Sequence, residues 1–327
     1  MKRLRVCMFA IMAILLVFSL LPGGAYAETS TVRTHAESAA LIDVASGRLL
    51  YSHNGDEPMR IASLTKIMTA IVAIESGALS DIVTVGPNAF GVEGSSIYLR
   101  LNEEMSLQHL LYGLMLRSGN DAAVAIAEHV GGSVEGFAML MNEKAAAIGM
   151  VNSYFVNPHG LDADGHLSTA NDMAVLTAYA LNNAAFRDIV KTPSINVPNP
   201  HEKWDYRWRN KNKMLHLYEG ADGVKTGYTK TAGRCLVSSA TRGGQQLVAV
   251  TLSDGDDWAD HAKLLNYGFK HYPSKLLYEG GKALEGTRLA SPYTFAYPLA
   301  EQERSEVKVE VEMTTADTIE ASLVKRR

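Results

Sequence analysis

The sequence predicts an α+β fold, in which one antiparallel sheet is backed by helices and carries an inserted helical lobe, with a short β-rich appendage at the C-terminus. Strand-like segments joined by glycine turns lie near both ends of the first 273 residues. Between them, apolar side chains recur with the 3.6-residue spacing that is typical of helices. The chain has 327 residues and is 47% apolar, which is enough to bury a full-sized core.

Two hairpins supply the predicted sheet. Ser46-Gly47 joins the strands of the first, and Gly243-Gly244 joins those of the second. Glycine turns between short apolar segments are a strong hairpin signal, and we expect both hairpins to share one antiparallel sheet. A helix over residues 258–268 should follow. The predicted strands are residues 39–44, 48–52, 235–241 and 246–253.

Five further helices are predicted between the hairpins. Ser106 and Asp121 each precede one of these segments, and both residue types suit an N-cap. The predicted helices cover residues 64–76, 107–116, 122–130, 134–148 and 172–182. A helical lobe inserted into a sheet predicts a cleft at their junction.

The C-terminal segment has a different pattern. From Val307 to Met313, apolar residues alternate strictly with charged ones, which indicates a half-buried strand. We therefore expect one domain over residues 28–273 and a small β-rich domain over residues 274–327.

The N-terminus has the pattern of a secretory signal peptide. Three basic residues precede an apolar run over residues 6–21, and Ala25-Tyr26-Ala27 is a small-x-small cleavage site. Cleavage after Ala27 would take the formal charge from −4 to −7. An acidic exported protein is a poor candidate for binding nucleic acid. Of the two cysteines, Cys7 would leave with the signal peptide, so Cys235 has no partner for an intramolecular disulfide and is expected to pack as a small apolar residue.

Three short motifs with reactive or polar groups occur in order along the chain. They are Ser63-Leu64-Thr65-Lys66, Ser118-Gly119-Asn120 and Lys225-Thr226-Gly227. Each is common by itself, since S-x-x-K is often a capping serine followed by a solvated lysine, and the other two are ordinary turns. Their joint occurrence in one exported chain favours a functional set.

The first motif places a serine and a lysine on one helix face. Ser63 precedes a helix that is apolar nearly all round, and Lys66 follows three residues later, within hydrogen-bonding reach. Free N–H groups in the first turn can stabilise an oxyanion. A lysine in a core helix is costly unless it has a task. That task would be to take the serine proton, which requires a pKa far below the usual value of about 10.4. Burial and the charge of Lys225 can lower it if the third motif lines the same cleft.

The other two motifs are placed to complete a cleft. Ser118-Gly119-Asn120 lies at a corner between two predicted helices, where a hydroxyl and an amide can point inward from a rigid base. Lys225-Thr226-Gly227 lies on or just before a predicted sheet edge. A substrate strand can add to that edge, with Lys225 and Thr226 meeting a carboxylate.

These motifs resemble those of low-molecular-mass penicillin-binding proteins, which are serine-type D-alanyl-D-alanine carboxypeptidases of the peptidase S11 kind. The resemblance runs from about residue 36 to residue 272, and residues 254–261 resemble the sporulation-associated branch of Gram-positive endospore formers. Further matching segments are Asn157-Pro158-His159-Gly160-Leu161-Asp162, Gly165-His166-Leu167-Ser168-Thr169-Ala170, Asp172-Met173-Ala174, Asp222-Gly223-Val224 and Tyr228-Thr229.

The resemblance implies a β-lactamase/transpeptidase-like fold and a role for each matched position. Ser63 would be the acylated nucleophile and Lys66 its base. Ser118 and Asn120 would relay a proton and bind the substrate amide. No metal and no cofactor is implied.

The third motif would bind the end of the substrate. The resemblance implies that Lys225 and Thr226 take the terminal carboxylate, that Gly227 keeps the strand open, and that the N–H groups of Ser63 and Tyr228 form the oxyanion hole. Family members also have a carboxylate-binding arginine near the start of the last helix, where this chain has Asp256-Asp257-Trp258. Carboxylate recognition must then rest more on Lys225 and Thr226, or on another basic residue.

The implied substrate is a peptidoglycan pentapeptide stem ending in D-Ala-D-Ala, with β-lactam antibiotics as acylating inhibitors. The implied location is extracytoplasmic, at the outer face of the membrane or in the wall. The family's C-terminal β domain is larger and precedes a membrane-anchoring amphipathic helix, whereas this chain stops at Arg327, before either would be complete. Loss of the anchor and truncation both fit, and the residues favour neither carboxypeptidase nor endopeptidase action.

The sequence also allows three alternative functions to be compared with this one. A class A β-lactamase needs a Glu-x-x-Leu-Asn segment, but Ala178 stands where that glutamate would precede Leu181-Asn182. A non-catalytic protein that binds wall fragments or β-lactams fits poorly with an intact S-x-x-K pair. The third alternative is a metallopeptidase with ligands His159, Asp162, Asp164 and His166. Loop histidines with satisfied hydrogen bonds fit that spacing better. Trp204, Tyr206 and Trp208 are expected to be core or cleft wall rather than a sugar platform.

Overall fold

A computed structural model describes residues 32–283, 290–313 and 319–325. The predicted signal peptide, residues 1–27, lies outside the described residues. No helix within the described part of the chain has the length and apolar character needed to cross a bilayer.

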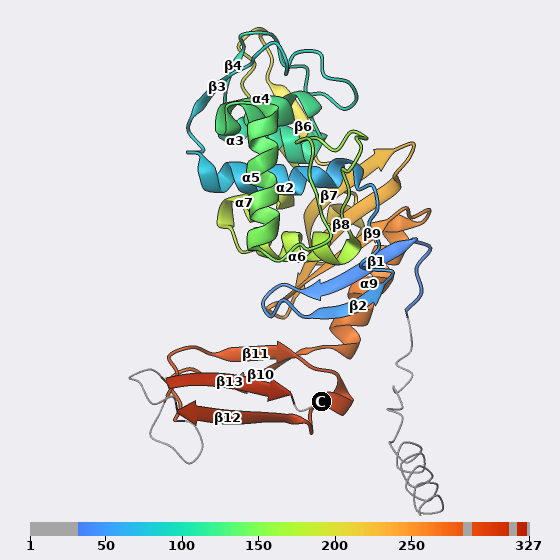
Figure 1. The fold of residues 1–327 in the computed structure, drawn as a ribbon, viewed down its shortest axis with the longest axis vertical. Coiled ribbons are helices and arrows are strands. Elements are labelled where there is room, and N and C mark those ends of the chain that lie inside the picture. The colour runs from blue at the N-terminus through green and yellow to red at the C-terminus, as the bar shows by residue number, and fades with distance from the viewer. Residues whose placement is uncertain (1–31, 284–289, 314–318, 326–327) are drawn as a thin grey trace, which may run out of the picture. The chain divides into compact units, whose positions relative to one another are not determined.

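A five-stranded antiparallel sheet forms the centre of the fold, with the strand order β2-β1-β9-β8-β7 (Figure 1). Both predicted hairpins are present, and they join through the pairing of β1 with β9, as expected. The third motif lies on β7, which is an edge strand. The strands are β1 (Ser38–Asp43), β2 (Leu49–His53), β7 (Ala221–Thr229), β8 (Gly233–Arg242) and β9 (Gln245–Leu252).

Helices cover both faces of this sheet. On one face, Leu41 and Leu247 lie so close to α9 (Asp257–His271) that a Cβ atom on Gly268 would come within 2.8 Å and 2.6 Å of them. On the other face, alternate residues such as Val248 belong to the main apolar core that the helical lobe shares. β9 is accordingly buried along nearly its whole length.

The helical lobe contains the five predicted helices, with local differences. The first begins as a 3₁₀ turn, Ala62–Thr65, and the second ends in a π turn, Gly113–Arg117. Two short helices, α7 and α8, were not predicted. The helices are α2 (Lys66–Ser76), α3 (Leu107–Tyr112), α4 (Asn120–Gly131), α5 (Val134–Ala147), α6 (Ala170–Leu181), α7 (Ala184–Lys191) and α8 (Met214–Leu217).

One predicted cap is confirmed and one is wrong. Ser106 Oγ accepts a hydrogen bond from His109 N at 3.2 Å, as expected of an N-cap. Asp121 lies inside α4 rather than before it. Its carboxylate instead accepts hydrogen bonds from the backbone of Ile97 and Leu99, which lie on a loop that the local pattern did not connect with it.

Four two-stranded ladders accompany the five-stranded sheet within the described residues. Two lie in the helical lobe and two in the C-terminal segment, where the strand predicted from Val307 to Met313 is confirmed. The side-chain burial predicted for that strand lies outside what is described. The ladders pair β3 (Ile82–Thr84) with β4 (Glu104–Ser106), β5 (Ser194–Val197) with β6 (Tyr206–Arg209), β10 (Ser274–Tyr278) with β11 (Phe295–Pro298), and β12 (Val307–Met313) with β13 (Ile319–Lys325).

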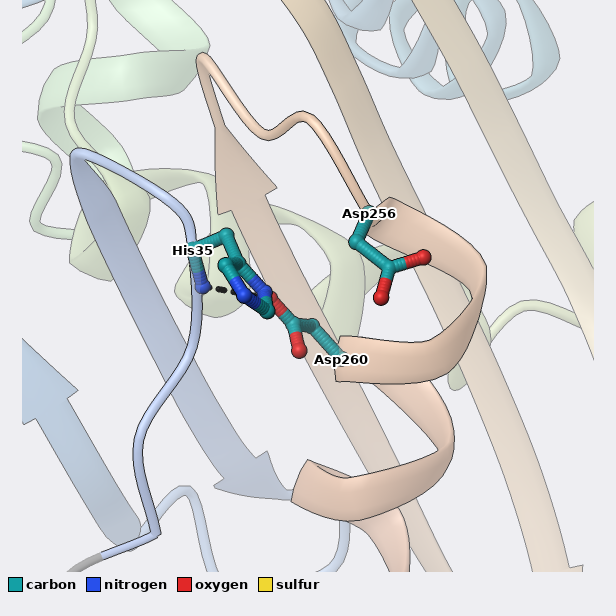
Figure 2. Close-up of side chains that lie close together, drawn as sticks. All are labelled: His35, Asp256 and Asp260. Carbon is teal, nitrogen blue, oxygen red and sulfur yellow. Dashed lines mark hydrogen bonds and ion pairs between the residues drawn. The ribbon is translucent and has the colours of Figure 1, made fainter.

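Hydrogen bonds between His35 and Asp260 connect the segment before β1 to α9. Figure 2 shows His35 beside Asp256 and Asp260, close enough together to suggest a cation site. Asp260 is already satisfied, because its Oδ2 faces the backbone N–H and Nδ1 of His35, and its Oδ1 accepts from Lys263 Nζ at 2.7 Å. We interpret the cluster as a structural contact.

His261 of α9 makes the stability of this layer depend on pH. The ring is fully buried, with Nδ1 against Ser238 Oγ and Nε2 3.0 Å from Thr251 Oγ1. Burial lowers the pKa of His261 from its ordinary 6.5 to about 3. The folded protein therefore holds this ring neutral at pH values where an unfolded chain protonates it.

The free energy of unfolding should decrease as the pH falls from 6.5 towards 3, the range between the unfolded and folded pKa values of His261. This one group should contribute a slope of up to about 1.4 kcal/mol per pH unit. His261→Gln should flatten the slope in urea unfolding curves, whereas the same change at His53, an exposed residue of β2, should leave it unchanged. Parallel curves for all three proteins would contradict this assignment.

Candidate active site

The predicted nucleophile lies at the junction of the sheet and the helical lobe. Ser63 is in the 3₁₀ turn that leads into α2, and Lys66 is the first residue of α2. Ala62, just before the serine, has a φ of 47°, an uncommon left-handed conformation for a residue with a side chain. The backbone thus turns sharply at the serine before the helix begins.

Lys66 is fully buried, and three oxygen atoms surround its amine. Nζ lies 3.1 Å from Ser63 Oγ, 2.7 Å from Asn120 Oδ1 and 2.6 Å from the backbone oxygen of His159. A neutral amine has two N–H bonds and one lone pair. The Asn120 and His159 oxygens can only accept, so they take the two N–H groups and leave the lone pair facing the serine hydroxyl.

The surroundings of Lys66 favour this neutral form. Burial is the main cause that lowers its pKa well below the ordinary 10.5, followed by the positive charges of Lys225 and Lys211. Asp121 acts weakly in the opposite direction. The effect of Lys225 is the one that the sequence predicted, and the effect of Lys211 was not foreseen.

The second motif forms one wall of the site. Ser118 follows the π turn with a φ of 65° and is 4% exposed. Asn120 is the first residue of α4, and its Nδ2 donates to Glu93 O at 2.6 Å while its backbone N donates to Ser95 O at 2.7 Å. These bonds hold Oδ1 towards Lys66.

The third motif lies against the nucleophile turn. The α-carbon of Gly227 is so close to this turn that an added Cβ would lie 3.2 Å from Ser63 N and from Ile61 O. Lys225 is buried, with Nζ 2.6 Å from Thr226 O, and burial together with Lys211 lowers its pKa to about 7. Absence of a side chain at position 227 thus lets β7 approach the serine.

A cavity of about 340 Å³ opens above these residues. Five of the eight predicted site residues line it, and Lys66, Asn120 and Lys225 are buried beside it. The lining residues are Ser63, Ser95, Ser118, Lys211, Thr226, Gly227, Tyr228, Arg234, Cys235, Asp257 and Trp258. The structure therefore brings all three motifs to one place.

Some lining residues were not anticipated. Lys211 enters the cavity from the loop before α8, and its Nζ lies 3.2 Å from Ser95 Oγ. Arg234 and Asp257 face the cavity as an ion pair. Asp257 is marked in the sequence only because it stands where family members have an arginine. No local signal marked Lys211 or Arg234, because both reach the site through tertiary packing.

A loop over residues 157–166 packs against the turn that carries Ser63. It supplies the His159 carbonyl that holds Lys66. Gly160 has a φ of 84°, and a Cβ there would lie 1.9 Å from Ala62 O. Only glycine fits a backbone contact this close.

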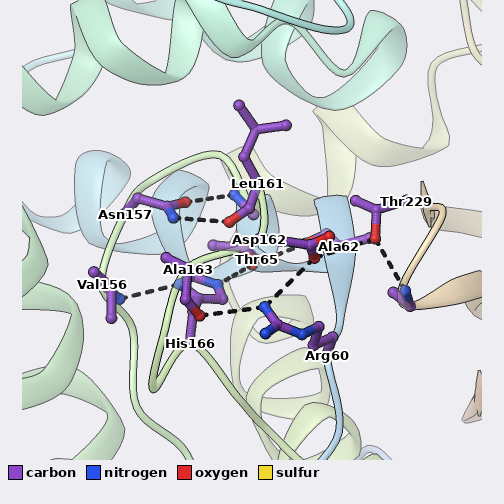
Figure 3. Close-up of polar contacts among 12 residues, drawn as sticks. Arg60, Ala62, Thr65, Val156, Asn157, Leu161, Asp162, Ala163, His166 and Thr229 are labelled. Carbon is purple, nitrogen blue, oxygen red and sulfur yellow. Dashed lines mark hydrogen bonds and ion pairs between the residues drawn. The ribbon is translucent and has the colours of Figure 1, made fainter.

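Polar contacts tie the same loop to the end of β7 (Figure 3). Arg60 Nη1 donates to Ala163 O at 3.3 Å and lies 3.7 Å from Asp162 Oδ1. Thr229 Oγ1 donates to the same carboxylate at 3.2 Å. The loop, the nucleophile turn and β7 therefore hold one another in place.

His159 and His166 have hydrogen-bond partners within the protein, as expected of structural loop histidines rather than of the metal ligands of a metallopeptidase. Val156 N–H donates to His166 Nδ1 at 3.0 Å, and Nε2 lies 2.8 Å from Thr65 Oγ1 (Figure 3). His159 Nδ1 accepts from Leu161 N at 3.1 Å. Burial, the largest cause in both cases, lowers the pKa of His166 to about 4 and that of His159 to about 3. Both rings are neutral parts of the scaffold.

Two other expectations concern side chains near the site. Cys235 is 1% exposed, and burial raises its pKa to about 11, so it packs as a small apolar residue as predicted. Trp208 is buried and stacks on Tyr206, with ring centroids 5.6 Å apart, which fits the prediction of core. Trp204 is 67% exposed, so the core prediction is wrong for this residue.

Comparisons with known proteins agree with this geometry. The sequence profile of the Peptidase_S11 family, described as D-alanyl-D-alanine carboxypeptidase, matches residues 25–256. D-alanyl-D-alanine carboxypeptidase DacF of Bacillus subtilis is 35% identical over 91% of this chain and 80% of its own length. DacC of Escherichia coli is 37% identical, over 76% of this chain and 65% of its own length.

Solved structures show the same relationship. Penicillin binding protein 6B of Escherichia coli matches with a TM-score of 0.76 and 29% identity, over 92% of this chain and 95% of that one. The predicted fold class and the resemblance drawn from the three motifs are thus confirmed. The chain belongs to the peptidase S11 family of D-alanyl-D-alanine carboxypeptidases.

Proposed function

We propose that this protein is a serine carboxypeptidase that removes the terminal D-alanine from peptidoglycan stem peptides ending in D-Ala-D-Ala. One observation carries the proposal: Lys66 Nζ, whose pKa is lowered mainly by burial, lies 3.1 Å from Ser63 Oγ, beside a cavity of about 340 Å³. Membership of the carboxypeptidase family gives the class of reaction.

Acylation begins when Lys66 takes the proton of Ser63, and Oγ attacks the carbonyl carbon between the two D-alanines. The negative charge that develops on the carbonyl oxygen is met by the N–H groups of Ser63 and Tyr228. The peptide C–N bond then breaks. The proton passes from Lys66, through Ser118, to the leaving amine, and D-alanine departs with the Oγ ester left behind.

In deacylation, Lys66 acts as the base a second time, with water in place of Ser63 as the nucleophile. Lys66, again neutral, takes a proton from a water molecule, whose oxygen attacks the ester carbon. The C–Oγ bond breaks and the proton returns to Ser63. The products are D-alanine and a stem peptide shortened by one residue, and no metal or cofactor enters the scheme.

The substrate is proposed to dock as an extra strand along β7, which is an edge of the sheet. Thr226 and Lys225 would take part in binding its carboxylate, and Asn120 its amide. β-Lactams carry a strained amide and a carboxylate, so they would acylate Ser63 in the same way. The penicillin-binding names of the structural neighbours support this part of the proposal.

Peptidoglycan chemistry implies an extracytoplasmic place of action. We further propose that residues 1–27 are removed as a signal peptide, that residues 28–273 form the catalytic domain, and that residues 274–327 form a separate β-rich domain. A role in sporulation, suggested by residues 254–261, stays a prediction.

Ser63→Ala should abolish covalent capture of β-lactams. Intact mass spectrometry after incubation with benzylpenicillin should show one added drug molecule on the wild type and none on the variant, because the alanine has no oxygen to acylate. Release of D-alanine from a D-Ala-D-Ala peptide should fall by at least about a thousandfold. An adduct on the variant would place the nucleophile elsewhere, and a wild type with neither adduct nor turnover would indicate a non-catalytic binding protein.

When the acylation rate constant is plotted against pH, its decrease on the acidic side should follow the protonation of Lys66. Lys225→Met removes a positive charge that lowers the pKa of Lys66, so this decrease should move to higher pH. The second-order rate constant for benzylpenicillin, followed by intact mass across the pH range, gives the measurement. Lys191→Met changes an exposed lysine in α7 and serves as the control. A decrease that stays at the same pH in Lys225→Met would contradict the proposed coupling.

Gly160→Ala should impair both stability and acylation. The new Cβ collides with Ala62 O, next to the nucleophile, and displaces the His159 carbonyl that orients Lys66. We expect a loss of about 1–3 kcal/mol in the free energy of unfolding, with a slower reaction with benzylpenicillin. Gly165→Ala is the matched control, since Gly165 has a similar φ of 78° in the same loop but no atom within 4 Å of an added Cβ. Equal effects of the two changes would show that the contact with Ala62 is unimportant.

A further inference from the structure

The third motif provides a weak cation for a carboxylate. Lys225 is 1% exposed, and its Nζ is engaged with Thr226 O rather than directed freely at the cavity. Burial and Lys211 lower the pKa of Lys225 to about 7. The pKa of Lys211 is also lowered by burial and by Arg117. An arginine, which stays charged and can bond both carboxylate oxygens, would strengthen carboxylate binding beyond what these lysines provide.

Arg234 occupies the position where such a group is needed. It pairs with Tyr228 across β7 and β8, while Thr226 pairs with Leu236, two residues further along β8. Cross-strand partners share one face of a sheet, and diagonal neighbours lie within reach of a long side chain. Arg234 and Thr226 therefore project from the same face, and both line the cavity that contains Ser63.

Asp257 holds this arginine in place. Its Oδ2 accepts from Arg234 Nε at 3.1 Å, and its Oδ1 accepts from Nη2. The carboxylate is itself anchored, because Oδ1 also accepts from Trp258 N at 2.8 Å and the side chain is only 6% exposed. The arginine side chain is 46% exposed. Within the described residues, Asp257 bonds only one edge of the guanidinium, and Nη1 has no hydrogen-bond partner.

We propose that Arg234, positioned by Asp257, binds the terminal carboxylate of the substrate and sets the preference of the enzyme for a free C-terminus. Arg234 is then a specificity-determining residue and Asp257 a positioning residue. The family's arginine is expected near the start of the last helix, and this chain has Asp257 there instead. The cation comes from β8, and the helix supplies its anion. The inference rests on the proposed function, because it names a residue that selects the substrate of that site.

The chemistry of the pair suits this role. A guanidinium presents five N–H groups in a planar fork, so it can bond one carboxylate along one edge and a second along the other. The bond to Asp257 is the main cause that raises the pKa of Arg234 above its ordinary value, and the guanidinium therefore stays charged. Thr226 can add its hydroxyl from the adjacent strand.

The test compares two peptides that differ only at the C-terminus. Diacetyl-L-lysyl-D-alanyl-D-alanine carries the carboxylate, and its C-terminal amide lacks it. The measured quantity is kcat/KM for release of D-alanine or D-alaninamide, determined by mass spectrometry. Arg234→Gln should lower the value for the free acid by about 10- to 100-fold and leave the amide within about twofold, so the preference for the acid collapses. Unchanged turnover of the amide also shows that the variant is folded.

Further variants separate binding from general damage. Arg242→Gln makes the same change at the far end of β8, outside the cavity, and should keep the full preference for the acid. Asp257→Asn should raise KM for the acid with little change in kcat, because the arginine remains but is less well oriented. Arg234→Lys should recover only part of the preference, since an ammonium keeps the charge without the fork.

The outcomes are distinct from those that test the proposed function. If the wild type cleaves the acid and Arg234→Gln retains the preference, the inference is overturned while the carboxypeptidase assignment stands. Equal losses on both peptides would likewise overturn it, because they would mean general damage to the site. A wild type that cleaves neither peptide overturns the proposed function, and the inference with it.

Discussion

The structure of the site depends on keeping one amine uncharged inside the protein. Lys66 is fully buried, and an ammonium group there would need several charged or strongly polar partners to offset its lost hydration. Burial and the positive charges of Lys225 and Lys211 disfavour the ammonium, while the Asn120 and His159 oxygens orient the amine by accepting its N–H groups. Burial thereby makes Lys66 a weaker base than a free lysine, but it leaves the amine unprotonated and able to take the Ser63 proton.

Several elements are arranged to meet this requirement. α4 brings Asn120 to one side of the amine, and the loop over residues 157–166 brings a backbone carbonyl to the other. That loop is in turn fixed by a neutral His166 and by the contacts of Asp162 with Arg60 and Thr229. Segments far apart in sequence thus converge on a single nitrogen atom, and its position is set by all of them together.

The parts of this protein that follow from local pattern were predictable from sequence. Alternating apolar residues and glycine turns located the hairpins of the sheet, and six predicted helices are present, five in the lobe and α9 after the sheet. Of the two missed helices, α8 has only four residues, which is too short for a clear periodicity. α7 has eight residues and buries Phe186, Ile189 and Val190, a helical spacing that the sequence analysis did not use. The motifs located residues that the structure brings together around one cavity, because their residue types are chemically specific in combination.

What sequence reasoning missed depends on tertiary contact. The His159 carbonyl is a backbone atom, so no residue type marks it as a ligand of Lys66. Lys211 and Arg234 look like ordinary surface cations until strand register and loop packing bring them to the cavity. Asp121 was misassigned as a cap because its partners lie more than twenty positions earlier in the chain.

The edge position of β7 has a consequence beyond substrate access. An edge strand presents unpaired peptide groups to any extended chain, and proteins commonly cover or blunt such edges to prevent self-association. Here, covering the edge would close the site, and Gly227 cannot gain a bulky side chain without striking the nucleophile turn. The openness that suits substrate docking thus leaves this strand without the covering layer that usually protects a sheet edge, and protection against pairing has to come from the elements packed beside it, such as the turn that carries Ser63.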